Sequence, residues 1–184
     1  MALEYPDLDA VTRRYMTEEL FLDIWENRLY ISPRLSPSGA QEYPTLLRSA
    51  IETGNDSSLA AELRKNDTLN STEQRRKPKG GYTTAAVPVT APETLAEGEF
   101  NRFYARGLCR RAQEQSDHEL KVHRAKPVDN PRPQSEALIG STVAPDRLLV
   151  DLRTSIGVEP ALGVPPGPNS GLSVRLVKML GTKN

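Results

Sequence analysis

The chain has 184 residues, 37% of them hydrophobic and 26% charged, which fits a single domain with a modest core and excludes a wholly disordered protein. Its 24 basic and 24 acidic residues cancel, so it lacks the excess positive charge that direct nucleic-acid binders normally carry. A single cysteine, Cys109, excludes an internal disulfide framework and a CxxC metal site. We expect no signal peptide and no membrane span, because no charged-then-apolar leader opens the chain and no apolar run approaches ~18 residues.

The charges are unevenly distributed. Residues 1–64 contain 6 basic and 11 acidic residues, whereas residues 65–126 contain 12 basic and 8 acidic ones. An acidic front and a basic middle suit contact between copies of the chain, although separate solvated faces are the commoner cause of such a distribution.

Residues 1–64 are predicted to form a small helical unit. Apolar side chains recur at helical spacing over 16–30, where Thr17 is placed to cap the first turn. Pro44 then occupies the first position of a second predicted helix, and Ser58 caps a third. Three short amphipathic helices favour a small bundle.

Residues 65–92 interrupt this pattern and are predicted to be a basic linker or extended loop. The stretch KNDTLNSTEQRRKPKGG has almost no large apolar residue, and the YTTAAVPVTAP that follows reads as extended. A loop of this length is typical of a functional or mobile segment.

Residues 93–184 are predicted to form an α+β unit that begins with the strongest helix of the chain. An apolar stripe runs through Phe100, Phe103 and Tyr104 at helical spacing. Gly107 lies in the middle of this helix, where glycine is unfavourable by about 1 kcal/mol relative to alanine, so we expect another element to approach closely there.

Two strands and two arms complete the predicted unit. Residues 120–123 alternate like a half-buried strand, Pro145 opens a further helix, and the last strand reads GLSVRLVKML. The proline-rich segments 127–145 and 158–171 are predicted to be extended arms, because proline fixes φ at about −65° and removes an amide donor. The predicted fold class is therefore α+β, with one long central helix, few strands and long extended arms.

The core of this fold is expected to contain the largest apolar side chains on the clearest helical stripes. These are Trp25, Phe100, Phe103, Tyr104 and Leu149.

Candidate catalytic groups are few, and we expect no catalytic residue, metal or cofactor. Cys109 with Asp117 and His118 offers the residue types of a nucleophile and base, but no family signature surrounds it, and packing is the commoner role of a lone cysteine. Glu119 and Lys121 match half of a metal-dependent nuclease site, whose further acidic ligand has no evident source. The glycine-rich GVPPGPNSG lacks the GK[ST] of a phosphate loop.

Two basic clusters are the stronger candidates for binding a partner. One is an arginine ladder on the long helix, and the other is a cluster in the linker. A solvated face, a contact with another protein and a contact with nucleic acid are all open for them. The residues are Arg102, Arg106 and Arg110 of the ladder, and Arg75, Arg76, Lys77 and Lys79 of the linker.

The chain resembles small structural proteins of tailed-bacteriophage virions, of the capsid-associated, cement or connector kind. The resemblance lies in the N-terminal segment 1–30 and in the segments 124–140 and 159–176, which include most of the two arms. The resemblance implies partners that are other virion subunits or copies of the chain itself, and assembly in the host cytoplasm. It implies extended segments laid across neighbouring subunits, and it transfers no catalytic residue.

Three functions follow from these observations. The first is a non-enzymatic structural subunit of a larger assembly, with no membrane contact. The second is a nucleic-acid-associated regulatory or processing protein that uses the basic linker and the arginine ladder. The third is a small enzyme, with Cys109 or the pair Glu119 and Lys121 at its site.

Overall fold

The computed structural model describes residues 3–65, 67–115, 118–156 and 170–179. Its α+β composition and long helix α4 confirm the predicted fold class. The helices are α1 (Ala10–Trp25), α2 (Pro37–Thr53), α3 (Asp56–Leu63), α4 (Ala91–Glu114), α5 (Pro133–Leu138) and α6 (Pro145–Thr154). The strands are β1 (Thr72–Arg76), β2 (Tyr82–Ala86), β3 (His118–Arg124), β4 (Thr142–Val143) and β5 (Leu172–Lys178).

The first three helices begin earlier than the sequence predicted. Asp9 caps α1 by accepting a hydrogen bond from the amide of Thr12, so Thr17 lies inside the helix. Pro37 takes the first position of α2, and the predicted Pro44 lies in its interior. The capping box of α3 is formed by Asn55, with Ser58 as its third-position partner.

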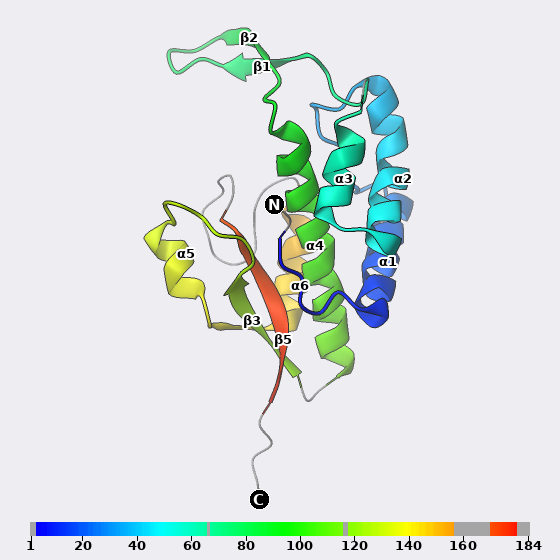
Figure 1. Ribbon diagram of the computed structural model, residues 1–184, viewed down its shortest axis with the longest axis vertical. Coiled ribbons are helices and arrows are strands. Elements are labelled where there is room, and N and C mark those ends of the chain that lie inside the picture. The colour runs from blue at the N-terminus through cyan, green and yellow to red at the C-terminus, as the bar shows by residue number, and fades with distance from the viewer. Residues whose placement is uncertain (1–2, 66, 116–117, 157–169, 180–184) are drawn as a thin grey trace, which may run out of the picture.

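Helix α4 lies at the centre of the molecule, between the N-terminal helices and the sheet (Figure 1). It packs against α1, α3 and α6, and strand β5 also contacts it. The helices of the predicted N-terminal unit therefore share one hydrophobic core with the predicted α+β unit of residues 93–184. The structure joins the two parts that the sequence analysis divided.

A three-stranded antiparallel sheet in the order β4-β3-β5 completes this core. Leu120 pairs with Leu176 and Val122 with Val174, and both β3 residues are buried, which confirms the predicted half-buried strand. The outer edge of β5 is occupied by side chains, since the amide of Leu176 donates to the carboxylate of Asp7 at 2.9 Å. Such capping protects an otherwise open strand edge.

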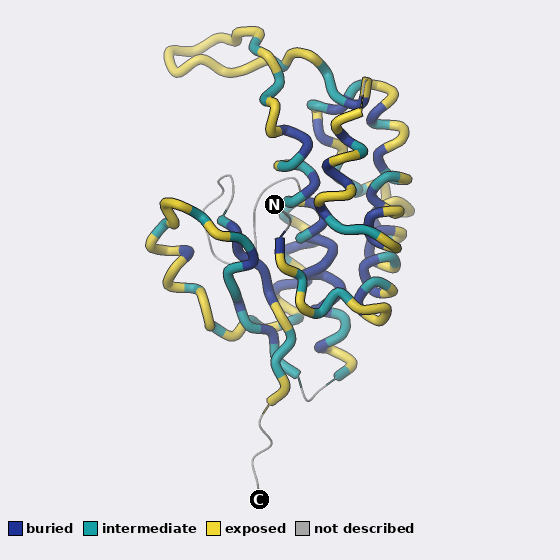
Figure 2. The backbone as a smooth tube through the Cα atoms, in the orientation of Figure 1, coloured by how far each residue is buried: buried dark blue, intermediate teal, exposed yellow. Residues whose placement is uncertain are grey.

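Buried residues follow the facing sides of the helices and the sheet (Figure 2), and the predicted core residues are buried with one exception. Phe100, Phe103, Tyr104 and Leu149 are at most 4% exposed, whereas Trp25 is 84% exposed. The prediction for Trp25 is wrong because α1 turns a different face inward. That face carries two buried carboxylates, which α4 neutralises, and the apolar side chains at the end of α1 remain outside.

Gly107 allows the close approach that the sequence predicted. A Cβ atom at this position would lie 2.9 Å from Cγ of Met16 and 3.0 Å from the carbonyl oxygen of Thr12. At those distances Met16 or the backbone at Thr12 would have to shift, so the glycine lets α1 and α4 approach this closely.

The predicted arm 127–145 folds back on its own chain. It contains α5 and β4, and the amide of Gly140 donates to the carbonyl of Val122 at 2.9 Å. Arg124 of β3 also forms an ion pair with Glu136 of α5. An extended arm is therefore wrong for most of this segment, because its few apolar residues and a short strand suffice to dock it. The second predicted arm, 158–171, lies outside the described residues except at its end.

The predicted linker 65–92 contains a β-hairpin. Strands β1 and β2 pair from Thr72 and Ala86 at the base to Arg76 and Tyr82 at the tip. Gly80 and Gly81 have φ of 91° and 77°, values that glycine adopts without strain, so they close the turn. The hairpin projects from one end of the helical layer (Figure 1). Within the described part of the chain, none of the helices is both long and apolar enough to span a bilayer.

Candidate functional site

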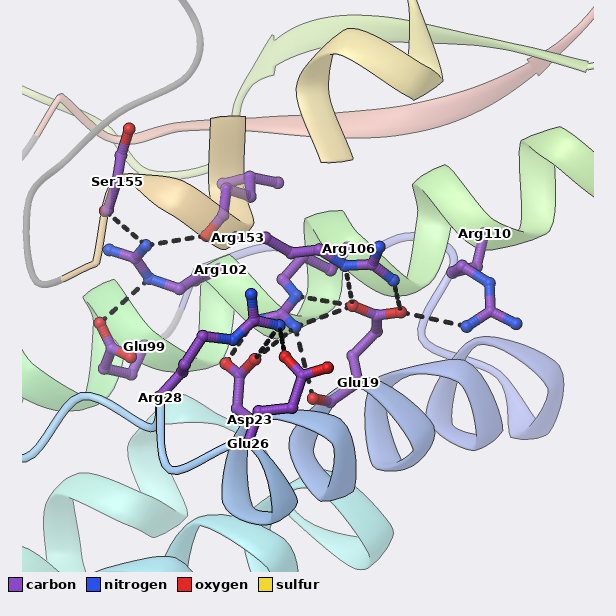
Figure 3. Close-up of polar contacts among 11 residues, drawn as sticks. Glu19, Asp23, Glu26, Arg28, Glu99, Arg102, Arg106, Arg110, Arg153 and Ser155 are labelled. Carbon is purple, nitrogen blue, oxygen red and sulfur yellow. Dashed lines mark hydrogen bonds and ion pairs between the residues drawn. The ribbon is translucent and has the colours of Figure 1, made fainter. Parts of the chain in front are cut away.

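A cluster of buried charges joins α1 to α4 (Figure 3). The guanidinium of Arg106 donates through Nε to Oε2 of Glu19 at 2.9 Å and through Nη1 to Oδ2 of Asp23 at 2.6 Å. Nη2 of Arg106 donates to Oδ1 of Asp23 at 2.9 Å, so the contact with Asp23 is bidentate. All three side chains are at most 7% exposed. Bidentate geometry is the strongest arrangement for such a pair.

Glu19 also accepts hydrogen bonds from two further arginines. Nη2 of Arg153 on α6 donates to Oε1 of Glu19 at 2.6 Å, and Nη1 of Arg110 donates to the same oxygen at 3.1 Å. Burial raises the pKa of Glu19, but hydrogen bonds from Arg153 and the charge of Arg106 outweigh it, so the pKa lies below its ordinary value. Glu19 is therefore a charged junction of α1, α4 and α6.

Arg102 forms the other end of the cluster. Its Nε donates to Oε1 of Glu99 at 3.2 Å, and its Nη1 donates to the carbonyl oxygens of Leu152 and Ser155 at 3.1 and 2.7 Å. Burial raises the pKa of Glu99 more than the charge of Arg102 lowers it. Arg102 thus ties α4 to the end of α6.

The predicted arginine ladder is therefore mostly internal. Arg106 is 1% and Arg102 7% exposed, and Arg110, which is more accessible, pairs with Glu18 and Glu19. The carboxylates that meet Arg106 and Arg110 belong to the same chain and not to another copy. Glu19 and Asp23 are four residues apart, as are successive arginines of the ladder. Equal spacing does not by itself show that the two helices face each other.

The candidate nucleophile Cys109 lies in the core. Its thiol is fully buried, and burial, followed by the negative charge of Glu19, raises its pKa. A nucleophilic cysteine needs a lowered pKa and access to solvent. Asp117, one of its two suggested partners, lies outside the described residues. The structure assigns Cys109 to packing.

The candidate nuclease pair lies on β3. Nζ of Lys121 is 2.9 Å from Oε1 of Glu119, and the hydroxyl of Thr142 donates to Oε2 of Glu119 at 3.3 Å. The hydrogen bond from Lys121 is the main cause that lowers the pKa of Glu119. Among the described residues, no group of three or more His, Cys, Asp or Glu side chains is arranged to hold a metal ion.

The basic cluster of the linker lies on the projecting hairpin. Arg75 and Arg76 end β1, and Lys77 and Lys79 lie in the turn. All four residues are exposed. Of the two clusters predicted from the sequence, this one remains available to a partner.

An apolar face on α1 is the functional candidate that the sequence analysis missed. Phe21, Ile24 and Trp25 are 47%, 41% and 84% exposed, and their spacing places them on one side of the helix. The same apolar spacing had been assigned to the core. The burial of Glu19 and Asp23 was the missing signal, because it turns this face outward.

Comparison of the chain with known protein families, with characterised proteins and with solved structures gives no match.

Proposed function

We propose that the protein is a non-enzymatic structural subunit of a larger assembly, and that it contacts a neighbouring copy through the outer face of α1. The observation that carries the proposal is the 84% exposure of Trp25 beside Phe21 and Ile24. Following the resemblance of the sequence, the proposed setting is a bacteriophage virion assembled in the host cytoplasm.

An exposed tryptophan is evidence for a contact with another protein, for an energetic reason. Exposed aromatic area is unfavourable in water, and tryptophan is enriched among the residues that dominate binding energy at interfaces. A cluster of three large apolar side chains on one helix face exceeds the scattered apolar residues of an ordinary surface.

Charges beside the apolar face favour a second copy as the partner. Glu18 and Arg14 lie about one and two turns before Phe21, and their side chains are 45% and 61% exposed. A surface that carries both signs can offer complementary charges to itself, as the contact in a symmetric dimer requires. The apolar centre with a charged rim matches the usual anatomy of an interface.

The predicted arm 127–145 does not supply this contact. The segment 127–145 is held within the chain by hydrogen bonds and by the ion pair between Arg124 and Glu136. The contact is therefore expected to be weak for an isolated pair, since one helix face buries less than the area of a stable dimer. In an assembly, several such contacts act together.

Sedimentation velocity tests this contact. The wild-type protein is expected to associate as its concentration rises into the range of a weak complex, and Trp25→Ser is expected to lower the association constant by about tenfold or more, as loss of a dominant interface residue does. Val89→Ser is the matched control, since Val89 is 91% exposed but lies outside the α1 face. A wild type that stays monomeric, or equal effects of the two substitutions, would overturn the proposal.

A further inference from the structure

We infer that the hairpin β1–β2 is a DNA-binding element that contacts the phosphate backbone of a duplex through Arg76, Lys77, Lys79 and Tyr82. The inference goes beyond the proposed function and does not depend on the α1 face. It rests on the shape of the hairpin, on its attachment to the body and on the chemistry of its side chains.

The hairpin projects from the body but is fixed at its base. Nε of Arg34 donates to Oε2 of Glu73 at 2.6 Å, and Nδ2 of Asn70 donates to the carbonyl oxygen of Leu35 at 2.9 Å. The amide of Val87 closes the base by donating to the carbonyl of Ser71 at 3.0 Å. A fixed base and an exposed tip place the hairpin to reach a partner with little loss of conformational entropy.

Beyond Glu73 at its base, the charged residues of the hairpin are all basic. No acidic residue occurs between Glu73 and Glu93. Glu73 is itself engaged by Arg34 and by Arg75, whose Nε lies 2.7 Å from Oε1 of Glu73. Among the described residues, no carboxylate lies within ion-pair distance of Arg76, Lys77 or Lys79, and that leaves three cations for an external anion.

The basic cluster of the hairpin differs in charge from the rest of the chain. The chain as a whole has equal numbers of basic and acidic residues, so the chain outside this acid-free hairpin is net negative. Many basic residues of the body are engaged in internal ion pairs, Arg106 most completely. A polyanion is therefore attracted to the hairpin and not to the helical body.

The other polar side chains of the hairpin favour phosphate over carboxylate as the bound group. Arg76 and Tyr82 lie directly opposite each other in the ribbon, and Tyr82 is 70% exposed. The neighbouring pair on the same face is Gln74 and Thr84. Arginine, lysine, glutamine, threonine and tyrosine are the side chains that donate to phosphate oxygens at protein–DNA interfaces.

The dimensions favour a duplex over a single strand. Paired strands lie about 4.8 Å apart, and the major groove of B-form DNA, about 12 Å wide, admits a two-stranded ribbon. Proteins that bind DNA with β-ribbons use this geometry. A single-strand site is built differently, from several aromatic side chains along a basic groove, whereas Tyr82 is the one aromatic residue between 72 and 86.

Fluorescence anisotropy with a short labelled DNA duplex tests the inference. Three phosphate contacts predict that the affinity of the wild-type protein falls roughly 40-fold as salt rises from about 50 to about 200 mM. The triple variant Arg76→Gln, Lys77→Gln and Lys79→Gln is expected to lose more than about tenfold in affinity at the lower salt. Its logarithmic salt slope should decrease by about 3, since each lost phosphate contact removes about 1.

A matched variant separates local contact from net charge. Replacing Arg48, Lys65 and Arg147 with glutamine removes the same charge from exposed positions elsewhere. This variant is expected to retain at least about half of the wild-type affinity for the duplex, since distant exposed charges are screened. Equal weakening by the two variants, or no duplex binding by the wild type at about 50 mM salt, would overturn the inference.

Two further binding measurements, with other polyanions, identify the ligand. A labelled single strand and polyglutamate carry negative charge without the duplex backbone, and both are expected to bind more weakly than the duplex. Polyglutamate binding as tight as duplex binding would identify an acidic protein surface as the partner and overturn the inference. Self-association of the hairpin variant should equal that of the wild type, so this result is independent of the α1 contact.

Discussion

Replacing Glu19 with glutamine is expected to lower the free energy of unfolding by about 3–5 kcal/mol, because it removes the carboxylate from a buried group of charges. Glu19 accepts hydrogen bonds from Arg106, Arg110 and Arg153, and its side chain is 0% exposed. Without its charge, the guanidinium of Arg106 keeps only Asp23 as a counter-ion. Urea unfolding at neutral pH measures the change, with an unchanged slope on urea as the check for two-state behaviour.

Glu18→Gln is the matched control for this substitution. Glu18 is the preceding residue on α1, and its side chain is 45% exposed and pairs with Arg14 and Arg110. Because exposed ion pairs contribute about 0–1 kcal/mol, this variant should unfold close to the wild type. Equal destabilisation by the two variants would show that the charge of α1, and not the buried junction, is what matters.

The pH dependence gives a second measure of Glu19. Its pKa in the folded protein lies below the ordinary value of 4.5. Its contribution to stability is therefore complete above that value and is lost as the pH falls through the lower, folded pKa. The difference in unfolding free energy between wild type and Glu19→Gln should thus shrink as the pH falls below about 4.5.

Phe103→Ala is expected to cost about 3–5 kcal/mol, as for a large aromatic side chain deleted from a packed core. The ring of Phe103 is 0% exposed. The guanidinium carbon of Arg106 also lies 4.9 Å from its centroid, so the substitution removes a contact of the buried cluster as well. Thermal and urea unfolding both measure the loss.

Phe21→Ala makes the same chemical change at an exposed position. Phe21 is 47% exposed on the outer face of α1, so its loss should destabilise the monomer by only about 1 kcal/mol. A Phe103→Ala variant that melts like the wild type would mean that the inward face of α4 is assigned wrongly.

The elements with a single apolar stripe could be predicted from the sequence. Phe100, Phe103 and Tyr104 recur on one side of α4, and all three are buried. Leu120 and Val122 alternate with polar residues in β3, and both are buried. In these elements hydrophobic periodicity and burial coincide, which makes the pattern sufficient.

The orientation of α1 could not be predicted in this way. The helix carries apolar residues on two sides, and its buried side includes Glu19 and Asp23. Burying a carboxylate is favourable only where a cation meets it, and the arginine that does so lies 83 residues beyond Asp23. Periodicity within one helix holds no information about that distant partner. The exposure of Trp25 and the burial of Arg106 are two results of the same contact.

The hairpin was missed for a different reason. Its strands are exposed at all positions but Glu73 and Ala85, which are half-buried, so no alternation of large apolar and polar residues marks them. What forms them is the turn at Gly80 and Gly81 and the pairing from Thr72 to Ala86. The basic residues were found from composition alone, but only the structure places them at the tip of a projecting element.

Photo-crosslinking from position 25 tests the proposed assembly contact most directly, with p-benzoylphenylalanine in place of Trp25 and mass spectrometry to map the products. We expect crosslinks between two copies of the chain, centred on the outer face of α1 near Phe21 and Ile24. Crosslinks that form only within one chain, or that scatter evenly over the surface of the second copy, would contradict it.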